Sequence, residues 1–80
     1  MNIIDKTIGI LDGYTPYSNL GQDYVQRGVN YLLKGNKEKA KDEFIYSGLG
    51  LKGLLYFACR IYTGEHESDV YEFIINNFSE

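Results

Sequence analysis

Apolar side chains recur at helical spacing along most of this chain. Tyr24, Gly28 and Tyr31 share one face of a helix, and Ala40 with Phe44 forms a narrower stripe on the helix that follows. Glycine-containing turns interrupt the spacing, and no strand-like alternation competes after residue 18. The pattern predicts five helices, at residues 2–12, 18–34, 37–46, 51–63 and 67–78.

The predicted boundaries rest on capping residues and on one proline. Asn2, Ser18 and Asn36 each stand where a side chain can accept a hydrogen bond from the first amides of a helix. Pro16 pushes the residue before it into an extended conformation and cannot continue a helix. Residues 13–17 are therefore predicted to form a non-helical connection.

Gly28 interrupts a helix in which alanine would be favoured by roughly 1 kcal/mol. We therefore expect a neighbouring helix to approach closely at this position. Only Gly35 and Asn36 separate the helices on either side, so residues 18–34 and 37–46 should form a tight helical hairpin. Gly28 and Ala40 are expected at the contact between its two helices.

The N-terminal segment allows two interpretations. In a helix, Ile4, Ile8 and Leu11 share one face, and Asp5 suits the first turn. A strand through residues 6–11 is the alternative, because isoleucine and threonine favour strands. We favour the helix.

Length and composition indicate one small all-α domain, 1–80, divided into 1–17, 18–47 and 48–80. Of its 80 residues, 44% are apolar, which is enough for a packed core. One cysteine cannot form an internal disulfide, which favours a reducing compartment. No apolar run is long enough to span a bilayer, and the first residues lack the basic start of a secretory signal. We expect a cytoplasmic protein without a membrane anchor.

The net charge of −3 is unevenly distributed. Residues 34–41 carry four lysines against one glutamate, whereas residues 65–80 carry five carboxylates and no lysine or arginine. These runs are either ordinary solvated helix faces or the two ends of a polar molecule suited to head-to-tail association. The acidic total argues against nonspecific nucleic-acid binding.

An internal repeat emerges when the chain is shifted by 30 residues against itself. Small residues then fall on small ones and large on large, except where Val70 meets Ala40. The matching pairs are Tyr24 with Leu54, Gly28 with Ala58, Tyr31 with Ile61, Ala40 with Val70 and Phe44 with Ile74. The chain is therefore predicted to contain two copies of one hairpin and an N-terminal helix.

The first copy, residues 21–48, resembles a tetratricopeptide repeat. The matching positions are Tyr24, Gly28, Tyr31, Gly35, Ala40 and Phe44. The second copy, 51–77, matches loosely, and the related Sel1-like repeats share much of the pattern. The usual proline near the repeat end is absent, and the 30-residue period is short for the family. The resemblance implies a right-handed helical stack whose concave face binds peptides or proteins, in proteins that are rarely enzymes.

Candidate chemistry is sparse. His66 stands among Glu65, Glu67 and Asp69, but one histidine is a poor ligand set, so a surface position at a helix start is the better interpretation. Cys59 lies on the most apolar helix and is expected to be a buried structural residue. We expect no catalytic residue, no metal and no cofactor.

The chain has eight tyrosines and no tryptophan. Tyr24, Tyr31 and Tyr62 are expected to pack inside. The candidates for partial exposure are Tyr14, Tyr17, Tyr46, Tyr56 and Tyr71. Tyrosine suits protein interfaces, but it also completes the core of a small domain, and the sequence does not separate these two roles.

These observations predict a small non-enzymatic adaptor, regulator or inhibitor that binds another protein, itself, or both. Two hairpins leave an apolar flank open, so a homodimer is expected. The predicted partner-binding residues are Tyr24, Tyr31, Lys34, Lys37, Lys41, Phe57, Ile61 and Phe73. The small size would also fit an inhibitor encoded by a phage or mobile element. The alternative is a nucleic-acid-binding helix-turn-helix at 18–46, with Lys37, Lys39 and Lys41 on its second helix.

Overall fold

A computed structural model describes residues 2–79, which form five helices and no strand. The helices are α1 (Ile3–Leu11), α2 (Gln22–Leu33), α3 (Lys37–Tyr46), α4 (Leu51–Ile61) and α5 (Glu67–Phe78). The all-α prediction is confirmed, including the helical interpretation of the N-terminal segment. Within this range no helix is long and apolar enough to cross a membrane.

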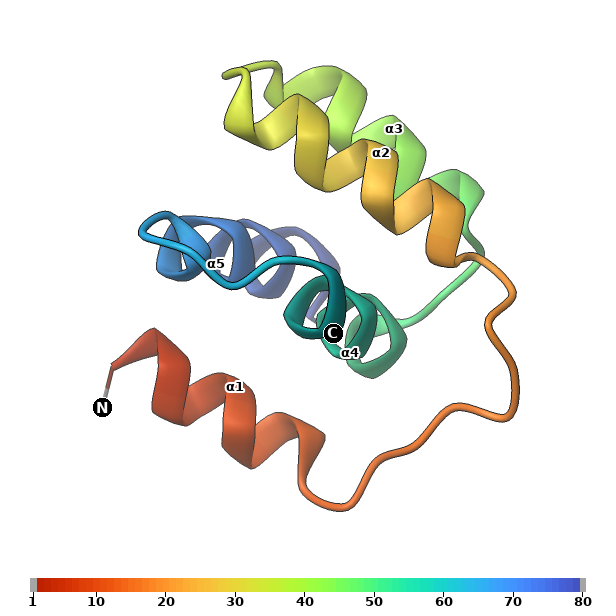
Figure 1. Cartoon of the computed structure of the whole chain (residues 1–80), viewed down its shortest axis with the longest axis vertical. Coiled ribbons are helices and arrows are strands. Elements are labelled where there is room, and N and C mark those ends of the chain that lie inside the picture. Colours follow the sequence, from red (N-terminus) through yellow and green to blue (C-terminus); the bar gives the residue numbers. More distant parts are fainter. Residues whose placement is uncertain (1, 80) are drawn as a thin grey trace.

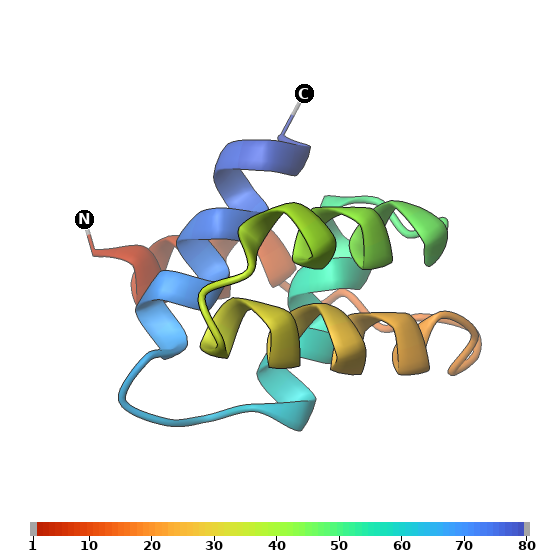
Figure 2. The same cartoon turned by 90° about the horizontal axis from the view of Figure 1, so that it is seen from above.

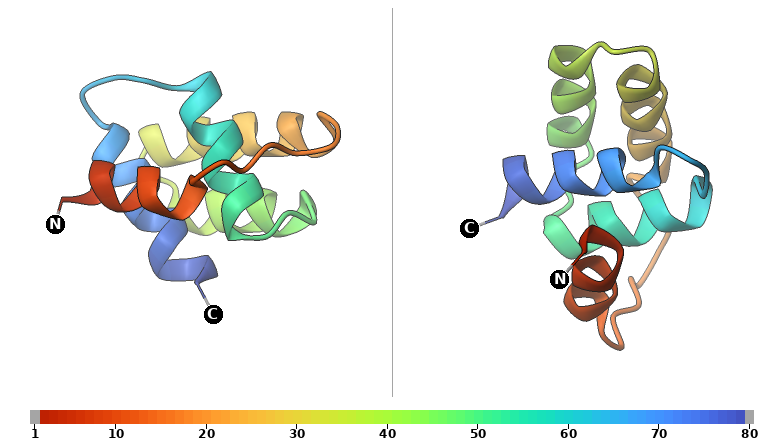
Figure 3. Two further views of the ribbon diagram at one scale, coloured as in Figure 1. Left: turned by 90° about the horizontal axis from the view of Figure 1, so that it is seen from below. Right: turned by 90° about the vertical axis from the view of Figure 1, so that its left-hand side faces the viewer.

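The helices form three layers (Figure 1). The α2–α3 hairpin is one outer layer, the α4–α5 pair is the middle layer, and α1 covers the opposite side of α4 and α5. The two pairs cross steeply, so α4 and α5 run across the direction of α2 and α3 (Figure 2). The views from below and from the side show the same order of layers (Figure 3). The middle pair is therefore covered from both sides.

Two of the three predicted caps are confirmed. The Asn2 side chain accepts a hydrogen bond from the Asp5 amide at 2.8 Å, and the Asn36 side chain accepts one from the Lys39 amide at 3.2 Å. The prediction that Ser18 caps the second helix is wrong. That helix begins at Gln22, one residue after a left-handed Gly21 (φ 91°).

Tertiary packing explains the later start of α2. A Cβ atom on Gly21 would lie 3.1 Å from both the Leu49 side chain and the Ser47 carbonyl oxygen. The turn is therefore pressed against the loop that follows α3, in a conformation that glycine adopts readily. Ser18 instead accepts a hydrogen bond from the Leu20 amide at 3.3 Å.

The buried face of α1 differs from the predicted one. Ile8 is 65% exposed, whereas Thr7 is 2% exposed and Ile4 and Leu11 are partly buried. The Thr7 hydroxyl donates to the Ile3 carbonyl at 2.8 Å, so its only polar group is satisfied inside the helix. Because its hydroxyl group already has a hydrogen-bond partner, Thr7 can face the core. The next residue, Ile8, then points toward solvent.

Phe44 lies at the centre of the core. It is fully buried, and its ring lies 6.2 Å from the ring of Phe73 and 6.0 Å from that of Phe78. A Cβ atom on Gly28 would come within 3 Å of three carbons of the Phe44 ring. The expected close approach at Gly28 is confirmed, and the group that approaches is Phe44.

Two tyrosine predictions are wrong. Tyr24 is 38% exposed, because Val25, Gly28 and Val29 form the buried face of α2. Tyr71, predicted to be partly exposed, is buried. Its hydroxyl donates to the Tyr62 carbonyl at 3.2 Å, which satisfies the polar end of the side chain inside the α4–α5 pair.

Candidate protein-binding surfaces

The exposed junction of α2 and α3 carries a continuous row of polar and aromatic side chains, here called the outer seam. Its members are Tyr24, Arg27, Tyr31, Lys39, Glu43 and Tyr46. Helix α2 contributes residues spaced by three and then four positions, and α3 contributes residues with the same spacing in reverse order. Antiparallel helices place such residues side by side on one face.

Three contacts cross the outer seam in order along its length. The Tyr24 and Tyr46 rings meet edge to face with their centroids 6.5 Å apart. The Arg27 Nε atom donates to the Glu43 Oε1 atom at 2.8 Å, and its guanidinium lies 4.6 Å above the Tyr24 ring. At the other end, the Lys39 Nζ atom lies 5.8 Å from the Tyr31 ring. These contacts hold the large side chains in place, and Tyr24, Arg27 and Tyr46 remain exposed.

Most of the exposed large hydrophobic side chains belong to the end of the outer seam that carries Tyr24 and Tyr46, or to the connection that leads to it. Within residues 2–79, seven large hydrophobic side chains are exposed, and five of them belong to this end of the hairpin or to its connection. They are Tyr17, Leu20, Tyr24, Ile45 and Tyr46. The first turn of α2 and the last turn of α3 lie together beside the connection from α1 (Figure 2). Among them, Tyr24 and Tyr46 contact each other directly and form a shared exposed aromatic surface, which makes this end a candidate interface.

The opposite end of the hairpin borders a second feature, here called the charged groove. It has a volume of about 630 Å³ and lies between the α2–α3 turn and α5. Leu33 and Phe73 contribute apolar surface to it. Lys37 comes from the hairpin side, and Asp69 and Glu72 come from α5. The fold therefore brings part of the basic run opposite part of the acidic run.

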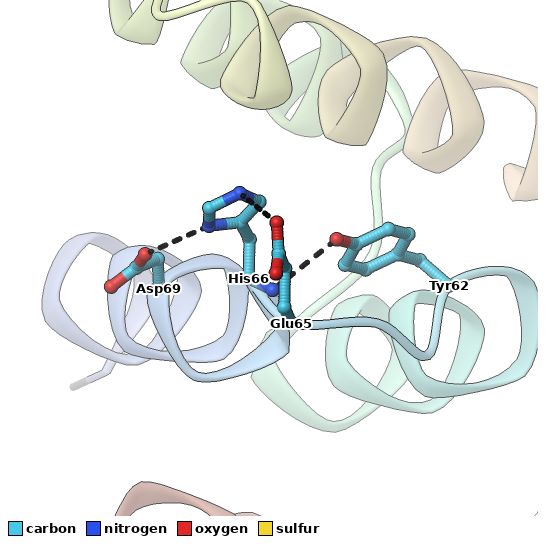
Figure 4. Close-up of polar contacts among 4 residues, drawn as sticks. All are labelled: Tyr62, Glu65, His66 and Asp69. Carbon is cyan, nitrogen blue, oxygen red and sulfur yellow. Dashed lines mark hydrogen bonds and ion pairs between the residues drawn. The ribbon is translucent and has the colours of Figure 1, made fainter.

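His66 lies at one end of the charged groove, directly before α5 (Figure 4). Its Nε2 atom is 3.4 Å from Glu65 Oε1 and its Nδ1 atom is 3.7 Å from Asp69 Oδ2. Its backbone amide donates to the Tyr62 hydroxyl at 3.4 Å. No three potential ligands among the described residues could share a metal ion. The arrangement is one of contacts between an exposed imidazole and two exposed carboxylates.

The predicted partner-binding residues are divided among several places. Lys37 and Phe73 meet at the charged groove, whereas Tyr24 and Tyr31 lie on the outer seam. Phe57 is fully buried, so in this structure it belongs to the core and offers no surface to a partner.

The remaining three predicted residues join neither feature. Ile61 is partly buried at the end of α4 and packs against the core. Lys34 and Lys41 are exposed on the hairpin. They contribute positive charge to its surface without a specific contact that marks a site.

Sequence reasoning missed Arg27 and Glu43 on the outer seam, and Glu72 on the charged groove. The spacing of Tyr24, Arg27 and Tyr31 is visible in the sequence. Their partners on α3 can be identified only with the register of the hairpin, which depends on tertiary packing.

The α2–α3 geometry does not favour the helix-turn-helix alternative. DNA-binding helix-turn-helix pairs cross at roughly 90–120°, which frees the second helix to enter a groove. Here α2 and α3 are antiparallel and pack against each other along their length (Figures 2 and 3). Helix α3 is therefore not set apart from α2 in the way that groove binding requires.

Cys59 is half-buried on α4 beside Tyr71. Burial raises the pKa of the Cys59 thiol above its ordinary value of 9.0, and the neighbouring Tyr71 hydroxyl offsets part of this rise. Burial and the neighbouring Cys59 thiol raise the pKa of the Tyr71 hydroxyl well above its ordinary value of 10. A raised pKa keeps the thiol protonated at neutral pH, so Cys59 is a weak nucleophile.

Because the pKa values of Cys59 and Tyr71 are raised in the folded chain, we expect the protein to lose stability in alkaline solution. The unfolded chain releases the two protons near pH 9 and 10, whereas the folded chain retains them. These two groups therefore do not change the free energy of unfolding below about pH 9, and they lower it as the pH rises further.

We expect the urea midpoint to decrease between about pH 9 and 11, and we expect Tyr71→Phe to make that decrease smaller. Ile8→Ala supplies the control, since it removes an exposed side chain without an ionisable group and should leave the slope unchanged. A midpoint that stays constant over this range would contradict the prediction.

Comparison of the chain with protein-family models, with curated proteins and with solved structures gave no match. The tetratricopeptide resemblance therefore stays a prediction, carried by the spacing of residues 21–48 alone.

Proposed function

We propose that this chain is a small non-enzymatic protein-binding module whose outer seam contacts another protein. The observation that carries the proposal is the exposed Tyr24–Tyr46 pair with Arg27 stacked beside it. Tyrosine and arginine are the residue types that most often dominate interface energetics, together with tryptophan. Acting as an adaptor, a regulator or an inhibitor would each require only this binding step.

The outer seam is also held in position before any partner arrives. Arg27 is fixed by Glu43 on one side and by the Tyr24 ring on the other. The backbone beneath it is held by the contact between Gly28 and Phe44. Binding to a surface that is already ordered costs less conformational entropy than ordering flexible side chains.

A library selection tests this proposal with random peptides as the probe. Peptides displayed on phage would be selected against the immobilised chain, and the enriched peptides would be measured by calorimetry. We expect micromolar binders that weaken at least about tenfold on Tyr24→Ala or Tyr46→Ala, because truncating a central aromatic removes more than about 1.4 kcal/mol.

Ile8→Ala is the matched control, since Ile8 is 65% exposed on α1, outside the outer seam. Its effect on binding should be less than about twofold. Enriched peptides that bind Tyr24→Ala and Tyr46→Ala as tightly as the unaltered chain would refute the seam as the binding surface. Binding of duplex DNA at low salt by micromolar protein would instead favour the nucleic-acid alternative.

A further inference from the structure

The charged groove carries opposite charges on facing walls, with Lys37 on the hairpin side and Asp69 and Glu72 on α5. Lys37 and Glu72 both line it, yet neither has an ion-pair partner within 4.0 Å among residues 2–79. Leu33, which is 43% exposed, and the partly buried Phe73 supply apolar surface in the same groove. An interface combines such features as an apolar centre with charged groups toward its rim.

This charge arrangement limits what can occupy the charged groove. A purely basic segment would be attracted by Asp69 and Glu72 and repelled by Lys37. A purely acidic segment would be attracted by Lys37 and repelled by the two carboxylates. A complementary occupant must present an anion to Lys37 and a cation to Glu72 at once. The groove surface itself, rotated by half a turn, presents these two charges.

We propose that the charged groove is the interface between two copies of this chain, related by a two-fold axis. The axis would place Lys37 of each copy against Glu72 of the other and bring the two sets of Leu33 and Phe73 together. In a two-fold interface, each contact between two different residues occurs twice. Lys37 and Glu72 of each copy therefore give two ion pairs per dimer, and Asp69 of each copy lies on the same side of the groove as Glu72. The outer seam lies elsewhere on the hairpin, so this inference is independent of the proposed function.

Charge reversal combined with mixing tests the pairing. Light scattering behind a sizing column, over about 10 µM to 1 mM protein, would give the mass of the unaltered chain, of Lys37→Glu and of Glu72→Lys. The unaltered chain should approach the mass of two copies as concentration rises and go no further. Each variant alone juxtaposes like charges twice, so its dissociation constant should increase at least about tenfold. Circular dichroism would verify that both variants remain helical.

An equimolar mixture of the two variants should recover dimerisation. In the mixed pair the two reversed positions face each other across one contact, and the native Lys37 and Glu72 meet at the other. Every contact is then again between opposite charges. The control mixture of Lys41→Glu with Asp42→Lys makes the same charge changes on exposed α3 residues outside the groove. Each control variant should dimerise like the unaltered chain.

Several results would overturn the proposal. One is a monomer at the highest concentration, which would leave the groove to a different protein. A second is a dimer that neither reversal weakens, and a third is a mixture no tighter than its separate components. Masses that grow beyond two copies would indicate head-to-tail contacts in place of a closed two-fold pair.

Discussion

Replacing Phe44 by alanine is expected to lower the free energy of unfolding by about 3–5 kcal/mol, the usual cost of truncating a buried phenylalanine. Phe44 is fully buried, contacts the rings of Phe73 and Phe78, and fills the space left by Gly28. A chain of 80 residues has a total stability of roughly 4–12 kcal/mol at the usual value per residue. The variant should therefore lose a large fraction of its free energy of unfolding, as measured by urea denaturation monitored by circular dichroism.

Ile45→Ala is the control for this variant. Ile45 follows Phe44 on the same helix but is 53% exposed, so the same helix loses an apolar side chain without opening a cavity in the core. We expect its free energy of unfolding to change by less than about 0.5 kcal/mol. If Ile45→Ala were as damaging as Phe44→Ala, the core would not be centred on Phe44.

Substituting alanine for Gly28 is expected to destabilise the fold, although alanine is the better helix former. The gain in helix propensity is roughly 1 kcal/mol. Against it, the added methyl group would lie within 3 Å of three Phe44 ring carbons, and the surrounding aromatic rings prevent that ring from moving away. Overpacking of this kind costs about 1–3 kcal/mol, and more when the neighbour is confined. We expect a net loss of up to about 2 kcal/mol. Each kcal/mol lost should lower the Tm by roughly 4–8 °C.

Gly9→Ala makes the same change in α1, where nothing lies within 4 Å of the added Cβ atom. There the propensity gain is unopposed, so the variant should be more stable than the unaltered chain by about 0.5–1 kcal/mol. Opposite signs for these two substitutions, measured by thermal unfolding, would identify the Phe44 contact as the reason for Gly28. A stabilised Gly28→Ala would show that Phe44 can move aside.

The candidate surfaces are only partly predictable from the sequence. Residue type and helical spacing point to Tyr24, Tyr31, Lys37 and Phe73, and the structure places each of them on the outer seam or the charged groove. The same reasoning points to Phe57, which lies in the core. An aromatic residue on an apolar helix has the same local pattern in either role, because its burial depends on which neighbouring helix covers it.

Local chemistry along the chain determined the helices and two of their caps. The helical periods, the Asn2 and Asn36 caps and the break at Gly35 require only interactions within a few residues, which a single sequence contains. Tertiary structure decided which face of each helix became the inner one. The start of α2 depends on Leu49 and Ser47 pressing against Gly21, and the exposure of Tyr24 follows from Val25 and Val29 facing the core. These outcomes depend on contacts between residues far apart in the chain, whose register no periodicity within one helix specifies.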